Sequence, residues 1–333
     1  MKPRVALAFA LLALLVSGFA ARVLVQETLS APAEVAPEQL FTVARGASLA
    51  HVARELRSAG LIRDARAFSW LARWRGQAEA LRAGEYRLSA ALPAGEVLER
   101  LVVGRVVTYE VVVPEGFTMA QIGERLAAQG LVEEVEFAAA VRDPEFIASL
   151  GFGSDSLEGY LYPETYQLPR GLGAAAVARL LVKHFQRAWE SLEPLAQTRD
   201  LDQHAAVTLA SIVEKETGAA QERPLIASVF ANRLARGMRL ESDPTVIYGL
   251  AGFDGNLRRR DLDDPDNPYN TYRHPGLPPG PISNPGRAAL HAVLAPAQSD
   301  YLYFVSRNDG SHVFSRTYRE HVNAVNRYQR GGR

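Results

Sequence analysis

The sequence contains no cysteine. A disulfide framework, a thiolate zinc site, a cysteine nucleophile and a lipid anchor on an N-terminal cysteine are therefore all excluded. The seven histidines show no metal-ligand spacing such as HExxH, so neither a metal nor another cofactor is expected. An excess of charge is also missing, because 37 basic residues balance 37 acidic residues. The sequence thus gives no electrostatic reason to expect a nucleic-acid partner.

An uncharged apolar run, Val5–Ala21, lies near the N-terminus. Its length is at the short end of the roughly 17–25 residues that span a bilayer. Lys2 and Arg4 precede it, which predicts a cytoplasmic N-terminus and an exported remainder. A cleaved signal peptide is the alternative, because Ser17–Ala20 offers small residues for cleavage. We expect an anchor, since the run is long for a signal peptide and continues as Val23–Val25.

An internal repeat follows a linker that covers residues 26–39. Residues 43–62 and 113–132 match at a constant offset of 70 residues. Each copy predicts a strand, a glycine turn, a Ser or Thr cap, and a helix with apolar residues at i, i+3 and i+7. The matched pairs are Gly46 with Gly116, Ser48 with Thr118, Leu49 with Met119, Val52 with Ile122, Leu56 with Leu126, Gly60 with Gly130, and Leu61 with Leu131. This unit resembles the LysM module, a small glycan-binding fold. A repeated β–α scaffold that only packs is the alternative.

The stretch Gln203–Thr217 has the pattern of a helix. On a helical wheel, Leu209, Ile212 and Val213 form an apolar stripe, and Glu216 points from the centre of that face. Burial there would raise the pKa of the Glu216 carboxyl, so that it could keep its proton near neutral pH and act as a general acid. The alternative is a structural Glu that is satisfied by an arginine or by backbone donors.

Four stretches nearer the C-terminus have unusual local chemistry. Glu241–Gly249 opens with an Asp-Pro turn. Tyr269–Tyr272 (YNTY) alternates aromatic and polar groups, a composition suited to sugars. His274–Gly286 is a stiff Pro/Gly loop, in which Asn284 and Pro285 predict the start of a helix. Residues 301–315 predict a β-hairpin that carries His312. Each stretch taken alone is typical of a surface segment.

Taken in order, these stretches resemble the endolytic murein transglycosylases of the MltG/YceG-like family. The resemblance covers nearly the whole chain, including the N-terminal apolar run and the LysM-like region. Its motifs are LEGYLYPETY, ASIVEKET, ERPLIASVFANRL, SDPTVIYG, YNTY, GLPPGPISNPG, YLYFV and HVFS.

The resemblance implies a reaction and a set of site residues. Members of the family cleave the β-1,4 bond between N-acetylmuramic acid and N-acetylglucosamine within nascent peptidoglycan strands. They use no metal and leave a 1,6-anhydromuramoyl end, which terminates or trims strand elongation. The second Glu of the EKE triplet is their acid and base, and here that residue is Glu216. By family position, the substrate groove would be lined by Glu158, Tyr162, Tyr248, Asn270, Tyr272 and His312.

Two alternatives to this function remain open. A hydrolytic muramidase would need a second acid opposite Glu216, and Glu158, Glu164 or Asp243 could supply it, although Asp243 before Pro244 is more typical of a turn cap. A non-catalytic glycan-binding scaffold of the wall-synthesis machinery would need no acid.

The expected fold class is α+β, with an N-terminal transmembrane helix, LysM-like β–α modules and a mainly helical catalytic domain bearing a β-hairpin. The expected domains are residues 1–25 (cytoplasmic N-terminus and anchor), 26–39 (linker), 40–150 (LysM-like repeated region) and 151–333 (catalytic).

Trp70, Trp74 and Trp189 are expected in a core or an interface. The expected location is the cell inner membrane, single-pass, with a periplasmic catalytic domain. Expected partners are peptidoglycan strands, the inner membrane and, as candidates, penicillin-binding synthases and other elongation or division proteins.

Overall fold

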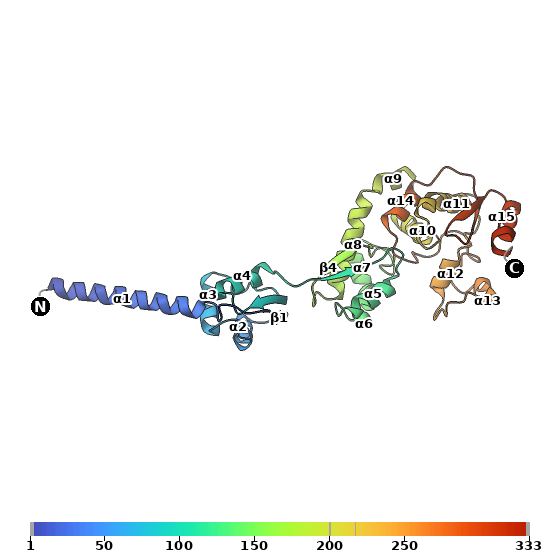
Figure 1. The fold of residues 1–333 in the computed structure, drawn as a ribbon. Helices are drawn as coiled ribbons and strands as arrows, with labels where there is room; N and C mark the ends of the chain where they lie inside the picture. Colours follow the sequence, from blue (N-terminus) through green and yellow to red (C-terminus); the bar gives the residue numbers. More distant parts are fainter. Residues whose placement is uncertain (1–2, 200, 217, 331–333) are drawn as a thin grey trace. The chain divides into compact units, whose positions relative to one another are not determined.

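The computed structural model describes residues 3–199, 201–216 and 218–330 (Figure 1). The fold is α+β, as the sequence predicts, and the described strands form three two-stranded sheets. The chain divides into two compact units, one of residues 1–109 with 167–172 and the other of residues 110–166 with 173–333. The domain limits at 25, 39 and 150 that the sequence suggests stay predictions.

The first unit is built on an antiparallel pair of strands covered by short helices. Phe41 pairs with Tyr86 in the centre of this sheet, and both side chains are buried. The elements in chain order are α1 (Pro3–Leu29), β1 (Glu38–Val43), α2 (Leu49–Ser58), α3 (Ala65–Trp74), β2 (Gly84–Ser89) and α4 (Ala94–Val103). Strands β3 (Tyr109–Val112) and β4 (Thr165–Leu168) form another two-stranded sheet. Each of these two strands has residues in both units.

The second unit is mainly helical and contains the predicted β-hairpin, β5 with β6, near its C-terminal end. Its elements are α5 (Met119–Ala128), α6 (Glu134–Ala140), α7 (Pro144–Ser149), α8 (Ala174–Glu190), α9 (Glu193–Arg199), α10 (Gln203–Glu216), the short 3-10 helix η1 (Ala220–Glu222), α11 (Arg223–Ala235), α12 (Asp243–Gly249), α13 (Arg259–Asp263), α14 (Arg287–Leu294), β5 (Tyr303–Ser306), β6 (His312–Ser315), α15 (Tyr318–Val325) and the π-helix η2 (Asn326–Arg330). The helix expected to start at Pro285 begins at Arg287 instead.

The repeat predicted from the sequence is present as local structure. Ser48 caps α2 by accepting a hydrogen bond from the His51 N–H, and Thr118 forms a capping box with Gln121 at the start of α5. The predicted apolar positions of both helices are buried. One copy lies in each compact unit. The likeness to LysM and glycan binding by this region stay predictions.

Two expectations about apolar segments have different outcomes. Among the residues that the structure describes, no helix has both the length and the apolar character required to cross a bilayer, and the anchor stays a prediction.

Trp189 is buried, as expected. Trp70 and Trp74 are 53% and 72% exposed, so a core position for them is wrong, while an interface position stays a prediction. The reason is that α3 buries its opposite face, including Phe68 and Leu71.

Helix α10 is the centre of the second unit, where it packs against α11, α12 and α14 (Figure 1). Every residue from Ala206 to Val213 is buried. The stripe of Leu209, Ile212 and Val213 predicted from the helical wheel is therefore confirmed as buried, and Val207 and Ala210 on the other side of the helix are buried as well. The last residue of the helix is Glu216.

Candidate active site

Glu216 is the last residue of α10, and its side chain is partly buried at the end of the helical core. Burial raises the pKa of the Glu216 carboxyl to about 7, because the anion loses its hydration. The nearby negative charge of Asp243 acts in the same direction. The Ser242 hydroxyl opposes both effects, since it donates a 2.5 Å hydrogen bond to Oε1. Both protonation states of this carboxyl are therefore accessible near neutral pH.

Glu214, two residues earlier on the same helix, has the structural role that was the alternative for Glu216. Its side chain is 5% exposed, and Oε1 accepts a 2.8 Å hydrogen bond from the Arg223 guanidinium. Oε2 accepts a hydrogen bond from the Gly286 N–H at 3.0 Å. An arginine and a backbone donor thus satisfy Glu214, while the Glu216 carboxyl accepts a hydrogen bond from a neutral hydroxyl.

Glu216 opens into a cavity of about 490 Å³, which we call cavity A. Two other predicted site residues, Tyr272 and His312, also line it. Its further lining residues include several that the sequence did not single out, namely Arg233, Glu241, Tyr303, Phe304, Tyr318 and His321. The tyrosine rings offer flat surfaces, and the guanidinium and imidazole groups offer hydrogen bonds. This combination fits a ligand with apolar faces and polar edges.

The polar residues of cavity A are held by hydrogen bonds that cross between chain segments. The Tyr272 hydroxyl donates to Asp243 Oδ1 at 2.7 Å. His312 Nδ1 is 2.7 Å from Glu222 Oε2, and the His312 N–H donates to the same carboxylate. Glu222 and Ser242, which orient catalytic candidates, were missed by the sequence reasoning. Glu222 is the first residue of the motif ERPLIASVFANRL, and Ser242 is the first residue of SDPTVIYG. A motif does not show which of its side chains point towards the cavity.

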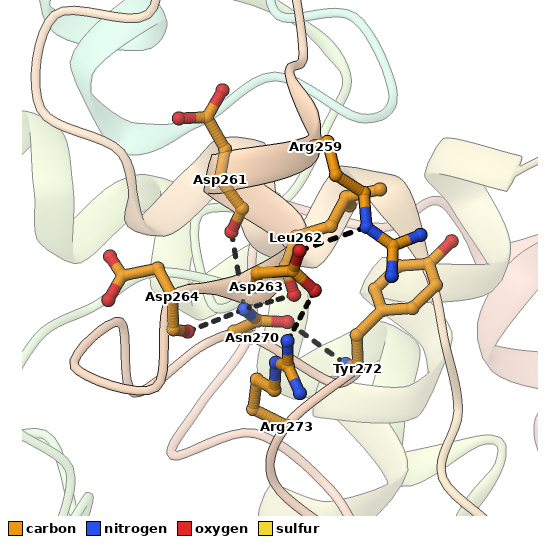
Figure 2. A network of polar contacts seen from close by, with 8 residues as sticks. All are labelled: Arg259, Asp261, Leu262, Asp263, Asp264, Asn270, Tyr272 and Arg273. Atoms are coloured by element: carbon orange, nitrogen blue, oxygen red, sulfur yellow. Dashed lines mark hydrogen bonds and ion pairs between the residues drawn. The ribbon is translucent and has the colours of Figure 1, made fainter.

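Asn270 is fully buried and positions the loop that carries Tyr272 (Figure 2). Its amide nitrogen donates to the carbonyl oxygens of Asp261, Leu262 and Asp264, the last at 2.6 Å. Its amide oxygen accepts the Tyr272 N–H at 3.0 Å. These contacts use both ends of the amide within the protein. Substrate contact by Asn270 stays a prediction, whereas its effect on Tyr272 is plain in the geometry.

Glu158, which is buried, and Tyr248, which is partly buried, form a separate group that does not line cavity A. Glu158 is 2% exposed and accepts hydrogen bonds from the Met119 N–H, from Asn284 Nδ2 at 2.9 Å and from the Tyr248 hydroxyl at 3.1 Å. Burial nevertheless raises the pKa of Glu158 to about 7. Tyr162 also lies outside cavity A, and its carbonyl oxygen accepts the Tyr166 hydroxyl. Substrate binding by these three residues stays a prediction.

Of the three acids that could serve a hydrolytic reaction, Glu158 and Glu164 do not line cavity A. Glu164 lies beside His184, with 2.5 Å between its Oε2 and the imidazole Nδ1. Of the three candidates, Asp243 lines cavity A with Glu216. Within the described part of the chain, no group of three or more His, Asp or Glu side chains is arranged to hold a metal ion.

The chain is similar to several known proteins. A family model described as the YceG-like family matches residues 41–327. An endolytic murein transglycosylase of Bacillus subtilis (strain 168) is 30% identical over 304 residues, which cover 86% of this chain and 84% of that protein. One from Streptococcus pneumoniae serotype 2 is 28% identical and covers 85% of this chain and 58% of that protein. A crystal structure of a yceG-like protein from Listeria monocytogenes has a TM-score of 0.60 and 34% identity, and covers 86% of this chain and 98% of that chain.

Glu158→Gln tests whether the buried carboxyl supports the fold. Above the Glu158 pKa of about 7, the ionised carboxylate accepts every bond that reaches it. A glutamine would direct its NH2 group towards one of these donors, so we expect the free energy of unfolding to fall by about 1–3 kcal/mol. Thermal unfolding measures the effect. The matched control is Glu216→Gln, which should change stability much less, and equal stability of the two variants would contradict the structural role.

Proposed function

The chain belongs to the YceG-like family, and on that premise we propose that it cuts peptidoglycan within the glycan strand, as an endolytic murein transglycosylase. The observation that carries the proposal is the setting of Glu216. Its carboxyl has a pKa of about 7 and faces a cavity with aromatic walls. A carboxylic acid in this setting can give up a proton and take one back at the pH of the reaction.

In the proposed reaction, Glu216 first acts as the acid. Its proton passes to the oxygen that joins muramic acid to the following N-acetylglucosamine, and the bond from that oxygen to the muramoyl anomeric carbon breaks. The ionised Glu216 then removes the proton of the muramoyl C6 hydroxyl, whose oxygen bonds to the anomeric carbon. The product is a 1,6-anhydro end, and Glu216 regains its proton. Because the nucleophile belongs to the substrate, a second catalytic carboxylate is not required.

The surroundings of Glu216 suit both halves of this cycle. Burial favours the protonated form, which the first step needs. The hydrogen bond from Ser242 stabilises the ionised form, which the second step needs. Tyr272 is fixed at the cavity wall by Asp243 and Asn270, so a sugar ring could pack against a surface that is already in place.

A hydrolytic muramidase is the second candidate, and Asp243 is the observation that favours it. This carboxyl lines cavity A together with Glu216 and could activate a water molecule. However, Asp243 Oδ1 already accepts the Tyr272 hydroxyl. We therefore assign Asp243 to orienting Tyr272 and to raising the pKa of Glu216.

The substrate in the cell and the location are further parts of the proposal. The strands cut are nascent ones, so cleavage would terminate or trim elongation beside penicillin-binding synthases and other elongation or division proteins. The N-terminal apolar run would hold the chain at the inner membrane with its catalytic part in the periplasm. The sequence supports this location through Lys2 and Arg4, which precede the run.

Product analysis distinguishes the two candidate reactions. Mass spectrometry of fragments released from purified glycan strands should show 1,6-anhydromuramoyl ends. Glu216→Gln should lower the rate roughly 100- to 10,000-fold, the usual contribution of a general acid–base group. Asp243→Asn should still give anhydro ends. Reducing muramic ends from the unchanged chain would assign hydrolysis, and intact strands would refute both reactions.

The pH dependence of cleavage should report the Glu216 pKa. The first step needs the protonated acid, so kcat/KM should decline as the pH rises through about 7. Ser242→Ala removes a bond to the anion, which raises the pKa of Glu216 and moves the decline to higher pH. Asp243→Asn removes a negative charge, which lowers this pKa and moves the decline to lower pH. Shifts in the same direction, or none, would show that Glu216 does not control the profile.

Cell fractionation tests the location. The full chain should stay in the membrane fraction after a high-salt wash, and external protease should cleave it once the outer envelope is opened. A chain without residues 1–25 should be released or remain in the cytoplasm. Recovery of the full chain in the soluble fraction would contradict the anchor and leave the enzymatic proposal standing.

A further inference from the structure

A second cavity, cavity B, lies in the same compact unit and has no part in the chemistry proposed above. Its volume is about 490 Å³. The loop 151–156, Tyr160, the start of α10 at His204, Tyr269 and the segment Pro279–Pro281 form its walls. Two of these segments belong to the YNTY and GLPPGPISNPG stretches, whose composition drew attention in the sequence.

Two rigid connections fix cavity B relative to cavity A. Helix α10 lines cavity B at His204 and cavity A at Glu216. At 1.5 Å per residue, these ends are about 18 Å apart. The YNTY segment makes the second connection, because Tyr269 lines cavity B and Tyr272 lines cavity A. Between them, Asn270 is buried and hydrogen-bonded (Figure 2). Thr271 is buried too, and its hydroxyl accepts the Ser242 N–H.

The walls of cavity B are themselves held in place. The ring centroids of Phe152 and Tyr160 are 4.4 Å apart. The Tyr160 hydroxyl is 2.9 Å from His204 Nδ1, and His204 Nε2 donates to the Pro279 carbonyl oxygen at 3.0 Å. The aromatic wall, α10 and the proline-rich segment are thus joined by direct contacts. A preformed site of this kind binds without a large ordering cost.

The chemistry of cavity B fits a neutral ligand rich in hydroxyl groups. Phe152 and Tyr269 offer partly exposed rings, and Asp155 and Asp202 offer carboxylates at the cavity surface. Among its described lining residues there is no lysine or arginine, so phosphate or carboxylate ligands would be poorly held. Sugar rings pack their C–H faces on aromatic side chains and donate their hydroxyl hydrogens to carboxylates.

Two glycines, Gly153 and Gly280, lie in the wall of cavity B, although neither the backbone conformation nor the packing at these positions requires a glycine. Neither Gly153 nor Gly280 has a left-handed backbone, and a Cβ at Gly153 would meet nothing within 4 Å. A Cβ at Gly280 would meet His204 and Tyr269 only at ordinary distances of 3.6–3.8 Å. Gly159 nearby is different, since its φ is +88° and a Cβ would lie 2.5 Å from Pro281. Packing therefore explains Gly159, while at Gly153 and Gly280 the lack of a side chain preserves space.

We propose that cavity B is a second binding site for N-acetylated sugar units of the same glycan strand that is cut in cavity A. The inference rests on the proposed function. A strand that occupies both cavities gains contacts beside His204, about 18 Å along α10 from Glu216, and these contacts orient it in cavity A. The enzyme would consequently prefer long strands to fragments that reach cavity A alone.

The test compares long and short glycan strands stripped of their stem peptides. Gly153→Trp and Gly280→Leu place a large side chain in cavity B, and Gly153→Ala and Gly280→Ala are their matched controls. The full chain and all four variants are assayed for kcat/KM on both substrates, with thermal unfolding as a check of folding. Each blocking variant should lose roughly tenfold on long strands, equivalent to about 1.4 kcal/mol, and little on short ones. The alanine variants should resemble the unchanged chain.

The outcomes separate the two proposals. If the unchanged chain cuts neither strand, the proposed function fails. If it cuts both but the blocking variants keep its preference for long strands, cavity B is not a sugar site. In a parallel assay on long strands that keep their stem peptides, a loss seen only with those strands would also overturn the inference and assign cavity B to the stem peptide. Because two positions block the cavity independently, misfolding of one variant still leaves a decisive comparison.

Discussion

The structure depends on the burial of one helix, α10, whose central residues are covered on every side. This burial brings the C-terminal end of the helix to the wall of cavity A and leaves Glu216 there with little hydration. The end of a helix carries partial negative charge, which disfavours an anion as well. The proton affinity that acid catalysis needs is therefore a consequence of packing that also stabilises the domain.

Three glutamates of the second unit show how partners decide the role of the same side chain. Glu214 is held by Arg223 and the Gly286 N–H, which suits a permanent anion. Glu158 is deeply buried and joins α5, Asn284 and Tyr248. Glu216 has a hydroxyl contact and faces a cavity. Only the last arrangement leaves a carboxyl free to exchange a proton with a ligand.

Buried amides and hydroxyls hold the irregular segments around this helix. Asn284 accepts the Leu161 N–H and donates to Glu158, so it ties two loops together and does not cap a helix. The Ser211 hydroxyl accepts the Ile282 N–H and fixes the proline-rich loop to α10. These bonds hold the loops in place, because each buried polar group needs its partner.

Local sequence determined much of this protein, namely the α+β class, the repeated capped helices that start at Leu49 and Met119, the span of α10 and the final hairpin. These features follow from caps, turns and periodicity, which act between residues that are close in the chain. The family motifs likewise singled out Glu216.

Tertiary structure decided which motif residues share a cavity: Tyr272 and His312 join Glu216, while Glu158, Tyr248 and Asn270 do not line that cavity. It also decided that Glu214 is paired and that Trp70 and Trp74 are exposed. The physical reason is that burial and partner choice depend on segments far apart in sequence, whose approach no local pattern encodes.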